Sequence, residues 1–238
     1  MPRFRGMLMS WTPAVDLKSA KIAAVVNVAS GRCSRATGAA LRGQLARHGL
    51  EPAHLWCGLG ADLPGVLDEV LADKPDVLIV LGGDGTIRTA AERCEPGGPL
   101  LMPLPGGTMN VLPRALYGGR TWRQALDAVA ARPQVRPVTG AEVAVLCPLA
   151  SARLDPGEAR LEAAVIHPEG PIDAVRLVLS AAFRDWRADP DVHCAMAETI
   201  EVLGNGPFPG LLDGERFTFE GSLKVRLVPE AFLALTPG

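Results

Sequence analysis

Residues 76–86, DVLIVLGGDGT, decide how this chain folds. The run from Asp76 to Leu81 is almost wholly apolar and is typical of a strand buried inside a sheet. A turn rich in glycine follows it directly, and sequence with helical character begins after the turn. This order is typical of an open parallel sheet, in which ligands bind beyond the carboxyl ends of the strands.

The same alternation extends to both sides of this stretch. Strands are predicted at residues 21–28, 51–56, 76–81 and 100–104, and helices at residues 36–48, 63–71 and 87–94. Strands and helices that alternate at these lengths predict an α/β domain whose parallel sheet carries helices on both faces.

The pattern changes beyond about Arg132. Apolar runs become shorter and turn residues recur, which favours β-rich structure. Strands are predicted at residues 143–146, 161–166, 174–179, 192–196 and 223–228, with one helical stretch near residues 179–186. We therefore expect a lead segment at residues 1–20, an α/β domain at residues 21–132 and a β-rich domain at residues 133–238.

Composition and charge exclude several classes of protein. The chain has 238 residues, of which 48% are hydrophobic, and this is enough apolar surface to bury a core. Its formal net charge is -2, so it lacks the basic surface of a nucleic-acid-binding protein. No apolar run reaches the roughly 18 residues of a membrane span, and no secretory signal is evident. We expect a cytoplasmic protein whose five cysteines, none in a CxxC pair, are reduced thiols.

The turn at residues 82–86 has the composition of a phosphate-binding loop. Its glycines let the backbone approach a phosphate closely, and a helix starting near Thr86 would add the positive end of its dipole. Asp84 is unexpected there, because a carboxylate about 4 Å from a phosphate charge costs on the order of 4 kcal/mol at a dielectric constant of 20. Three interpretations remain open: a Mg²⁺ ion offsets the charge, the carboxylate accepts hydrogen bonds from loop amides, or it accepts a proton from an acceptor hydroxyl.

A second loop, PGGTMN at residues 105–110, follows the next predicted strand. Thr108 offers a hydroxyl to a phosphate or to the loop, and Asn110 is a good N-cap for a helix that tolerates Pro113 in its first turn. Adjacent parallel strands end at the same edge of a sheet, so we expect the two loops to lie side by side. The chain contains no GxxxxGK[ST], no complete dinucleotide fingerprint, no GxSxG and no HExxH.

Three motifs together resemble a known family. NVASG at residues 27–31 is similar to NPxSG, GGDGT stands at residues 82–86, and PGGTMN is similar to PxGTxN. In order and spacing they resemble the catalytic domain shared by diacylglycerol kinases, sphingosine kinases and bacterial lipid kinases. The resemblance covers about residues 21–140, and a weaker match continues to the end of the chain through LLDGE at residues 211–215. The GGDGT turn alone is shared with NAD kinases.

The resemblance implies an ATP-dependent, Mg²⁺-requiring kinase that phosphorylates a hydroxyl of a diacylglycerol-like lipid. It implies nucleotide binding by the α/β domain and acceptor binding by a sandwich-like second domain. Asp84, Asp213 and Glu215 would be catalytic, with Glu215 the favoured proton acceptor. The residues implied to bind the nucleotide are Asn27, Ser30, Gly31, Gly82, Gly83, Asp84, Gly85, Thr86, Gly107, Thr108 and Asn110.

Some positions depart from the family pattern and keep alternatives open. Val28 replaces a proline, Val111 stands where an aspartate is usual, and HPEG at residues 167–170 replaces an acidic cluster that holds a structural metal, so no metal ligands are assigned. The alternatives are an NAD-kinase-like enzyme with a non-lipid acceptor and an inactive homologue that binds nucleotide or lipid. We expect a lipid substrate, transient contact with a membrane surface and no nucleic-acid partner. The oligomeric state is open, and a homodimer is compatible with the sequence.

Overall fold

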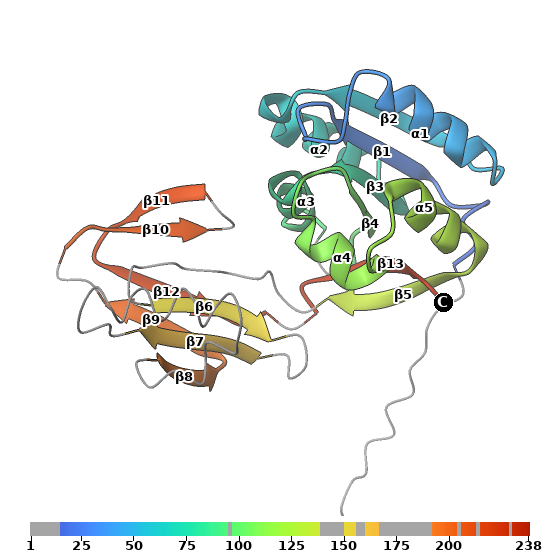
Figure 1. Cartoon of the computed structure of the whole chain (residues 1–238). Coiled ribbons are helices and arrows are strands. Elements are labelled where there is room, and N and C mark those ends of the chain that lie inside the picture. The colour runs from blue at the N-terminus through green and yellow to red at the C-terminus, as the bar shows by residue number, and fades with distance from the viewer. Residues whose placement is uncertain are drawn as a thin grey trace, which may run out of the picture. The chain divides into compact units, whose positions relative to one another are not determined.

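The protein consists of two compact units. A computed structural model describes residues 15–94, 97–138, 150–155, 160–166, 192–203, 206–212, 215–228 and 230–238. The first unit comprises Met1–Val138 together with Phe232–Gly238, and the second comprises Thr139–Ala231 (Figure 1).

A six-stranded sheet forms the centre of the first unit (Figure 1). Its strands, in spatial order, are β2 (Pro52–Gly58), β1 (Ile22–Asn27), β3 (Val77–Gly82), β4 (Leu100–Pro105), β13 (Phe232–Pro237) and β5 (Pro133–Val138). The first five run parallel, and β5 is antiparallel to β13. The predicted parallel sheet is confirmed, with one antiparallel strand at its edge.

Helices cover both faces of this sheet, as the sequence predicts. The helices are α1 (Thr37–Ala46), α2 (Leu63–Ala72), α3 (Asp84–Ala91), α4 (Val111–Tyr117) and α5 (Trp122–Ala131), with a 3₁₀ turn, η1, at Gly60–Asp62. Helices α1 and α5 contact each other on one face, and α2 and α3 contact each other on the other. None of the described helices combines the length and the apolar character needed to cross a lipid bilayer.

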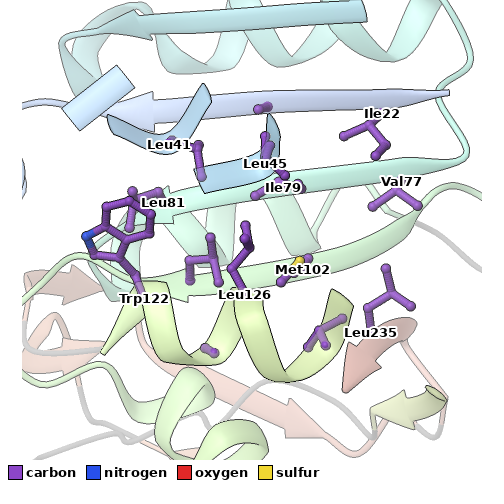
Figure 2. Packing of buried hydrophobic residues seen from close by; sticks show 14 of the residues in the cluster. Ile22, Leu41, Leu45, Val77, Ile79, Leu81, Met102, Trp122, Leu126 and Leu235 are labelled. Atoms are coloured by element: carbon purple, nitrogen blue, oxygen red, sulfur yellow. The ribbon is translucent and has the colours of Figure 1, made fainter. Parts of the chain in front are cut away.

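The main core lies between the sheet and helices α1 and α5. Figure 2 shows Leu41, Leu45 and Leu126 from these helices packed over the sheet residues Ile79 and Met102. Each of these five side chains is at most 3% exposed. Full burial of such a side chain contributes about 1.5–3 kcal/mol, so this layer fixes the sheet that positions the loops at its edge.

Strands β5 and β13 correct the predicted domain boundary. The sequence analysis places residues 133–238 in the second domain, but β5 and β13 pair with each other from Phe232↔Val138 to Pro237↔Pro133, and β13 also pairs with β4. Ala234 and Leu235 are completely buried in the first unit. The chain therefore leaves the first unit after residue 138 and returns to it at Phe232, where β13 buries its apolar side chains in this sheet.

Tyr117, the single tyrosine of the chain, ties helix α4 to this returning strand. Its hydroxyl donates a hydrogen bond to the Leu235 carbonyl at 2.8 Å, and burial raises the pKa of Tyr117 well above its usual value. Replacing Tyr117 by phenylalanine keeps the ring but removes this bond, so we expect the free energy of unfolding of the first unit to fall by about 1 kcal/mol. Urea unfolding followed by circular dichroism measures the loss, and a variant as stable as the parent protein would contradict it.

The described residues of the second unit form antiparallel strands. A three-stranded sheet is formed by β6 (Ala150–Asp155), β7 (Arg160–Ile166) and β8 (Val192–Ala197), and two pairs are formed by β9 (Thr199–Leu203) with β12 (Ser222–Arg226) and by β10 (Phe208–Leu212) with β11 (Glu215–Phe219). Leu161 of β7 and Val225 of β12 are buried in one apolar cluster, so two of these sheets pack against each other. This confirms the predicted β-rich character.

Three of the strands predicted for this region match observed ones. They are residues 161–166, 192–196 and 223–228, which correspond to β7, β8 and β12. The strands predicted at residues 143–146 and 174–179 and the helix predicted at residues 179–186 lie outside the described residues.

Candidate functional site

Three loops meet at the carboxyl edge of the first unit's sheet. They follow β1, β3 and β4, which are neighbours in the sheet, and comprise residues 27–33, 82–86 and 105–111. The strand ends are in register, since Val26 pairs with Leu81 and Gly82 pairs with Pro105. The expectation that the two glycine loops lie side by side is confirmed.

The two glycine loops touch through their backbones. The Gly106 N–H donates a hydrogen bond to the Gly82 carbonyl at 2.8 Å. A Cβ atom added to Gly107 would lie 2.6 Å from the Gly83 Cα, which is closer than real Cβ atoms approach other atoms. Only glycine therefore fits at position 107 with this separation of the loops.

Asp84 joins the same two loops. It is the first residue of α3, and its carboxylate oxygens accept hydrogen bonds from the backbone N–H groups of Asn110, at 2.9 Å, and Val111, at 2.6 Å. Of the three interpretations of Asp84, the structure shows the one in which the carboxylate binds loop amides. Both oxygens are engaged by the second loop at the start of helix α4.

Asn110 differs from its predicted role. It occupies the N-cap position of α4 but makes no side-chain capping bond, because its backbone is left-handed at φ 53° and ψ 52°. Its Oδ1 accepts a hydrogen bond from the Gly107 N–H, and its Nδ2 donates one to the Gly107 carbonyl, both at 2.8 Å. Asparagine is among the few residues that tolerate this conformation. Asn110 thus braces the second loop, and Asp84 satisfies the helix N–H groups instead.

The loop after β1 supports the GGDGT turn from the other side. The Ser30 Oγ accepts a hydrogen bond from the Gly83 N–H at 2.9 Å, and the Asn27 Nδ2 donates one to the Thr86 Oγ1 at 2.8 Å. Gly31 lies beside Thr108, since a Cβ atom there would be 3.4 Å from the Thr108 Oγ1. The structure therefore brings the three motifs of the sequence together, and several of their polar groups bind one another.

Some backbone N–H groups of these loops remain available. Within the described part of the chain, the N–H groups of Asp84, Gly85 and Thr86 have no hydrogen-bond acceptor, nor do those of Thr108 and Met109. The first three belong to the first turn of α3, which begins at Asp84, slightly before the start near Thr86 that the sequence predicts. Unpaired N–H groups at the start of a helix form an environment suited to an anion.

Arg32 and Cys33, which no motif singles out, also contact the second glycine loop. The Arg32 N–H donates a hydrogen bond to the Gly106 carbonyl at 2.9 Å, and the Cys33 thiol contacts the same oxygen at 3.8 Å. Burial, with a smaller contribution from the nearby Cys57 thiol, raises the pKa of Cys33 to about 11, so this thiol is protonated at neutral pH. Their place in the sequence is the one signal that could have identified them as site residues, since they directly follow the NVASG motif.

The acidic residues predicted for the second domain are described only in part. Asp213 lies outside the described residues, and Glu215 is the first residue of β11 but its side chain is not described. Among the residues that the structure does describe, no three His, Cys, Asp or Glu side chains form a group that could hold a metal ion. Asp84 is thus the one acidic side chain of the three loops, and the described donor set does not fit a Mg²⁺ ion held by the protein.

The family model described as the diacylglycerol kinase catalytic domain matches residues 21–143, which is more than half of the chain. This range begins just before β1 and contains all three loops. No curated protein sequence gives a significant match.

Solved structures resemble about nine tenths of the chain. A diacylglycerol kinase from Bacillus anthracis strain Sterne superposes with a TM-score of 0.66 at 17% identity, over 90% of this chain and 96% of that one. A second structure from the same organism, titled as a proposed diacylglycerol kinase, superposes with a TM-score of 0.70 at 16% identity, over 91% of this chain and 97% of that one. At these identities the similarity shows the fold.

Proposed function

Because this chain belongs to the family of the diacylglycerol kinase catalytic domain, we propose that it is an ATP-dependent lipid kinase. It transfers the γ-phosphoryl group of ATP to a hydroxyl of a diacylglycerol-like lipid, and through this substrate it contacts a membrane surface transiently. One observation carries the proposal: two glycine loops meet backbone to backbone at the sheet edge, beside the unpaired N–H groups of Asp84, Gly85 and Thr86.

The loops bind the phosphate chain of the nucleotide. The first turn of α3 offers the three N–H groups of Asp84, Gly85 and Thr86, which have no acceptor among the described residues. The helix dipole contributes about 0.3–1 kcal/mol for a negative charge placed there. Thr108, whose side chain is exposed, offers a hydroxyl from the second loop. Ser30 and Asn27 keep the GGDGT turn in place through their bonds to Gly83 and Thr86.

The transfer itself requires a proton acceptor. The lipid hydroxyl oxygen attacks the γ-phosphorus, the bond from this phosphorus to the bridging oxygen breaks, and ADP leaves while the hydroxyl proton passes to a carboxylate. Asp84 is unsuited to that role because both of its oxygens accept amide hydrogen bonds. Following the family resemblance, we assign the proton to Glu215, with Asp213 as its neighbour. A Mg²⁺ ion bound to ATP would supply charge neutralisation on the phosphates.

The test of this function is incubation of the protein with isotopically labelled ATP, Mg²⁺ and a mixed lipid extract, followed by mass spectrometry of the lipids. We expect a newly labelled phospholipid. Labelled NADP formed from NAD, with no labelled lipid, would favour an NAD-kinase-like enzyme. ATP binding without any product would indicate an inactive homologue.

Replacing Glu215 by glutamine tests the proton acceptor. The amide cannot take up a proton, so we expect the rate of phosphoryl transfer to fall by at least about a hundredfold while the affinity for ATP changes by less than about twofold. Glu220→Gln is the matched control, since Glu220 is an exposed glutamate between β11 and β12. Equal turnover by the Glu215 and Glu220 variants would remove Glu215 from the mechanism.

A further inference from the structure

The three loops at the sheet edge contain two charged residues. Residues 27–33, 82–86 and 105–111 are all described, and among them Asp84 and Arg32 alone carry a charged side chain. The Asp84 carboxylate is turned toward the amides of Asn110 and Val111. Arg32 is therefore the charged side chain of these loops that is left to meet a ligand.

The backbone of Arg32 is fixed against the second glycine loop. Its N–H donates to the Gly106 carbonyl at 2.9 Å, its neighbour Gly31 lies beside the Thr108 hydroxyl, and its neighbour Cys33 contacts the Gly106 carbonyl. Three successive residues thus hold this segment against the loop. The point from which the Arg32 side chain extends is set by the same contacts that shape the site.

The Arg32 side chain is exposed, and within the described part of the chain its guanidinium takes part in no ion pair and no hydrogen bond. Arg88, another arginine close to the turn, differs from Arg32 in having an acidic neighbour. Arg88 lies on α3 and approaches Glu92 at 3.8 Å. An arginine that is held by its backbone but has no acidic partner is suited to bind an anionic ligand.

From these contacts, and on the basis of the proposed function, we infer that the Arg32 guanidinium binds the phosphate chain of the nucleotide. A guanidinium presents several N–H donors in a planar fork that matches phosphate oxygens, and it stays charged at any pH relevant to the cell. Its charge offsets that of Asp84, which is necessarily close to the phosphates because it belongs to the same turn.

The experiment compares Arg32→Ala and Arg32→Lys with Arg35→Ala by titration calorimetry. Arg35 is also exposed and lies three residues further along the chain, outside the three loops. We expect Arg32→Ala to weaken the binding of MgATP by about tenfold, Arg32→Lys to recover part of this loss, and Arg35→Ala to bind within about twofold of the parent protein. Since the Arg32 backbone bond persists in every variant, the thermal unfolding midpoint is expected to stay unchanged.

Two probes separate contact with phosphate from contact with the rest of the nucleotide. The affinity for inorganic tripolyphosphate is measured by competition with ATP. We expect Arg32→Ala to bind tripolyphosphate more weakly than the parent protein does, by the same factor as for MgATP. The affinity for adenosine is expected to be the same in the variant and in the parent protein. Arg32→Ala that binds MgATP as tightly as the parent protein, or that loses ATP but not tripolyphosphate, overturns the inference and leaves the proposed function intact. A parent protein that binds no ATP overturns both.

Discussion

Replacing Gly107 by alanine is expected to open the contact between the two glycine loops and to abolish tight binding of ATP. The new Cβ atom would lie 2.6 Å from the Gly83 Cα and 3.3 Å from the Asn110 Oδ1. Gly83 cannot easily retreat, because its N–H is held by Ser30 and the preceding residue pairs with Pro105 in the sheet. Forcing extra volume into such a packed contact costs typically about 1–3 kcal/mol.

We therefore expect Gly107→Ala to lower the free energy of unfolding of the first unit by about 2 kcal/mol. We also expect ATP affinity to fall by more than about tenfold, since the N–H groups beside the loops would no longer converge. Chemical denaturation and titration calorimetry measure the two effects.

Gly43→Ala in helix α1 is the control, because a Cβ atom there meets nothing within 4 Å. It is expected to stabilise the protein slightly, by about 0.5–1 kcal/mol. If Gly107→Ala bound ATP like Gly43→Ala, the contact between the loops would be irrelevant to the site.

Replacing Asp84 by alanine is expected to damage stability and ATP binding together. The change leaves the N–H groups of Asn110 and Val111 without their acceptor. Water can reach Val111, which is 40% exposed, but it cannot readily replace the carboxylate at Asn110, which is only 2% exposed. Hydrogen bonds to a charged group contribute about 1.5–3 kcal/mol each, and we expect a total loss of about 3 kcal/mol in unfolding free energy. Denaturant unfolding and ATP titration of the same preparation provide the measurement.

A second variant distinguishes positioning from proton transfer at Asp84. Asp84→Asn keeps one oxygen for one of the two amides, so we expect intermediate stability and intermediate ATP affinity. A residue that only accepted a proton would give the opposite pattern, with turnover abolished but stability and binding intact. Asp62→Ala is the matched control, since Asp62 also lies at the start of a helix, as the N-cap of α2, but its side chain makes no capping bond. Its effect on stability is expected to stay within about 0.5 kcal/mol.

The sequence predicts the centre of the first unit's sheet well because strands β1, β3 and β4 are buried almost throughout. All six residues of β1 and of β3 are buried, and such continuous apolar runs are recognisable without any knowledge of their neighbours. The predicted strands at residues 21–28 and 76–81 each agree with the observed strand to within one residue at either end. The glycine turns after them locate the site for the same reason, because parallel strands end at one edge.

Helix α5 is an element that the analysis of hydrophobic periodicity did not predict. It is not among the predicted helices, although Thr121 and Gln124 form a capping box at its start, with each side chain bonded to the other's backbone N–H. The T-x-x-Q spacing was the available signal. Helix α5 then supplies Trp122 and Leu126 to the main core.

The roles of the polar site residues could be predicted only in part. Asn110 has the composition of an N-cap, but its side chain braces Gly107, and the capping acceptor comes from Asp84, 26 residues earlier in the chain. A local pattern cannot reveal an acceptor supplied by a neighbouring loop. The same limitation applies to Arg32, whose relation to Gly106 depends on how two strands pair with β3.

The sequence by itself determined the strands β1 to β4, the order of the three motifs and the sheet edge at which they lie, since burial and glycine turns leave local traces. Tertiary structure alone decided that β13 returns to the first unit beside β4, and that Asp84 serves the second loop. Both depend on contacts between segments far apart in the chain. Hydrogen-bond partners at that separation are set by the packing of the sheet, and no local pattern of residues encodes them.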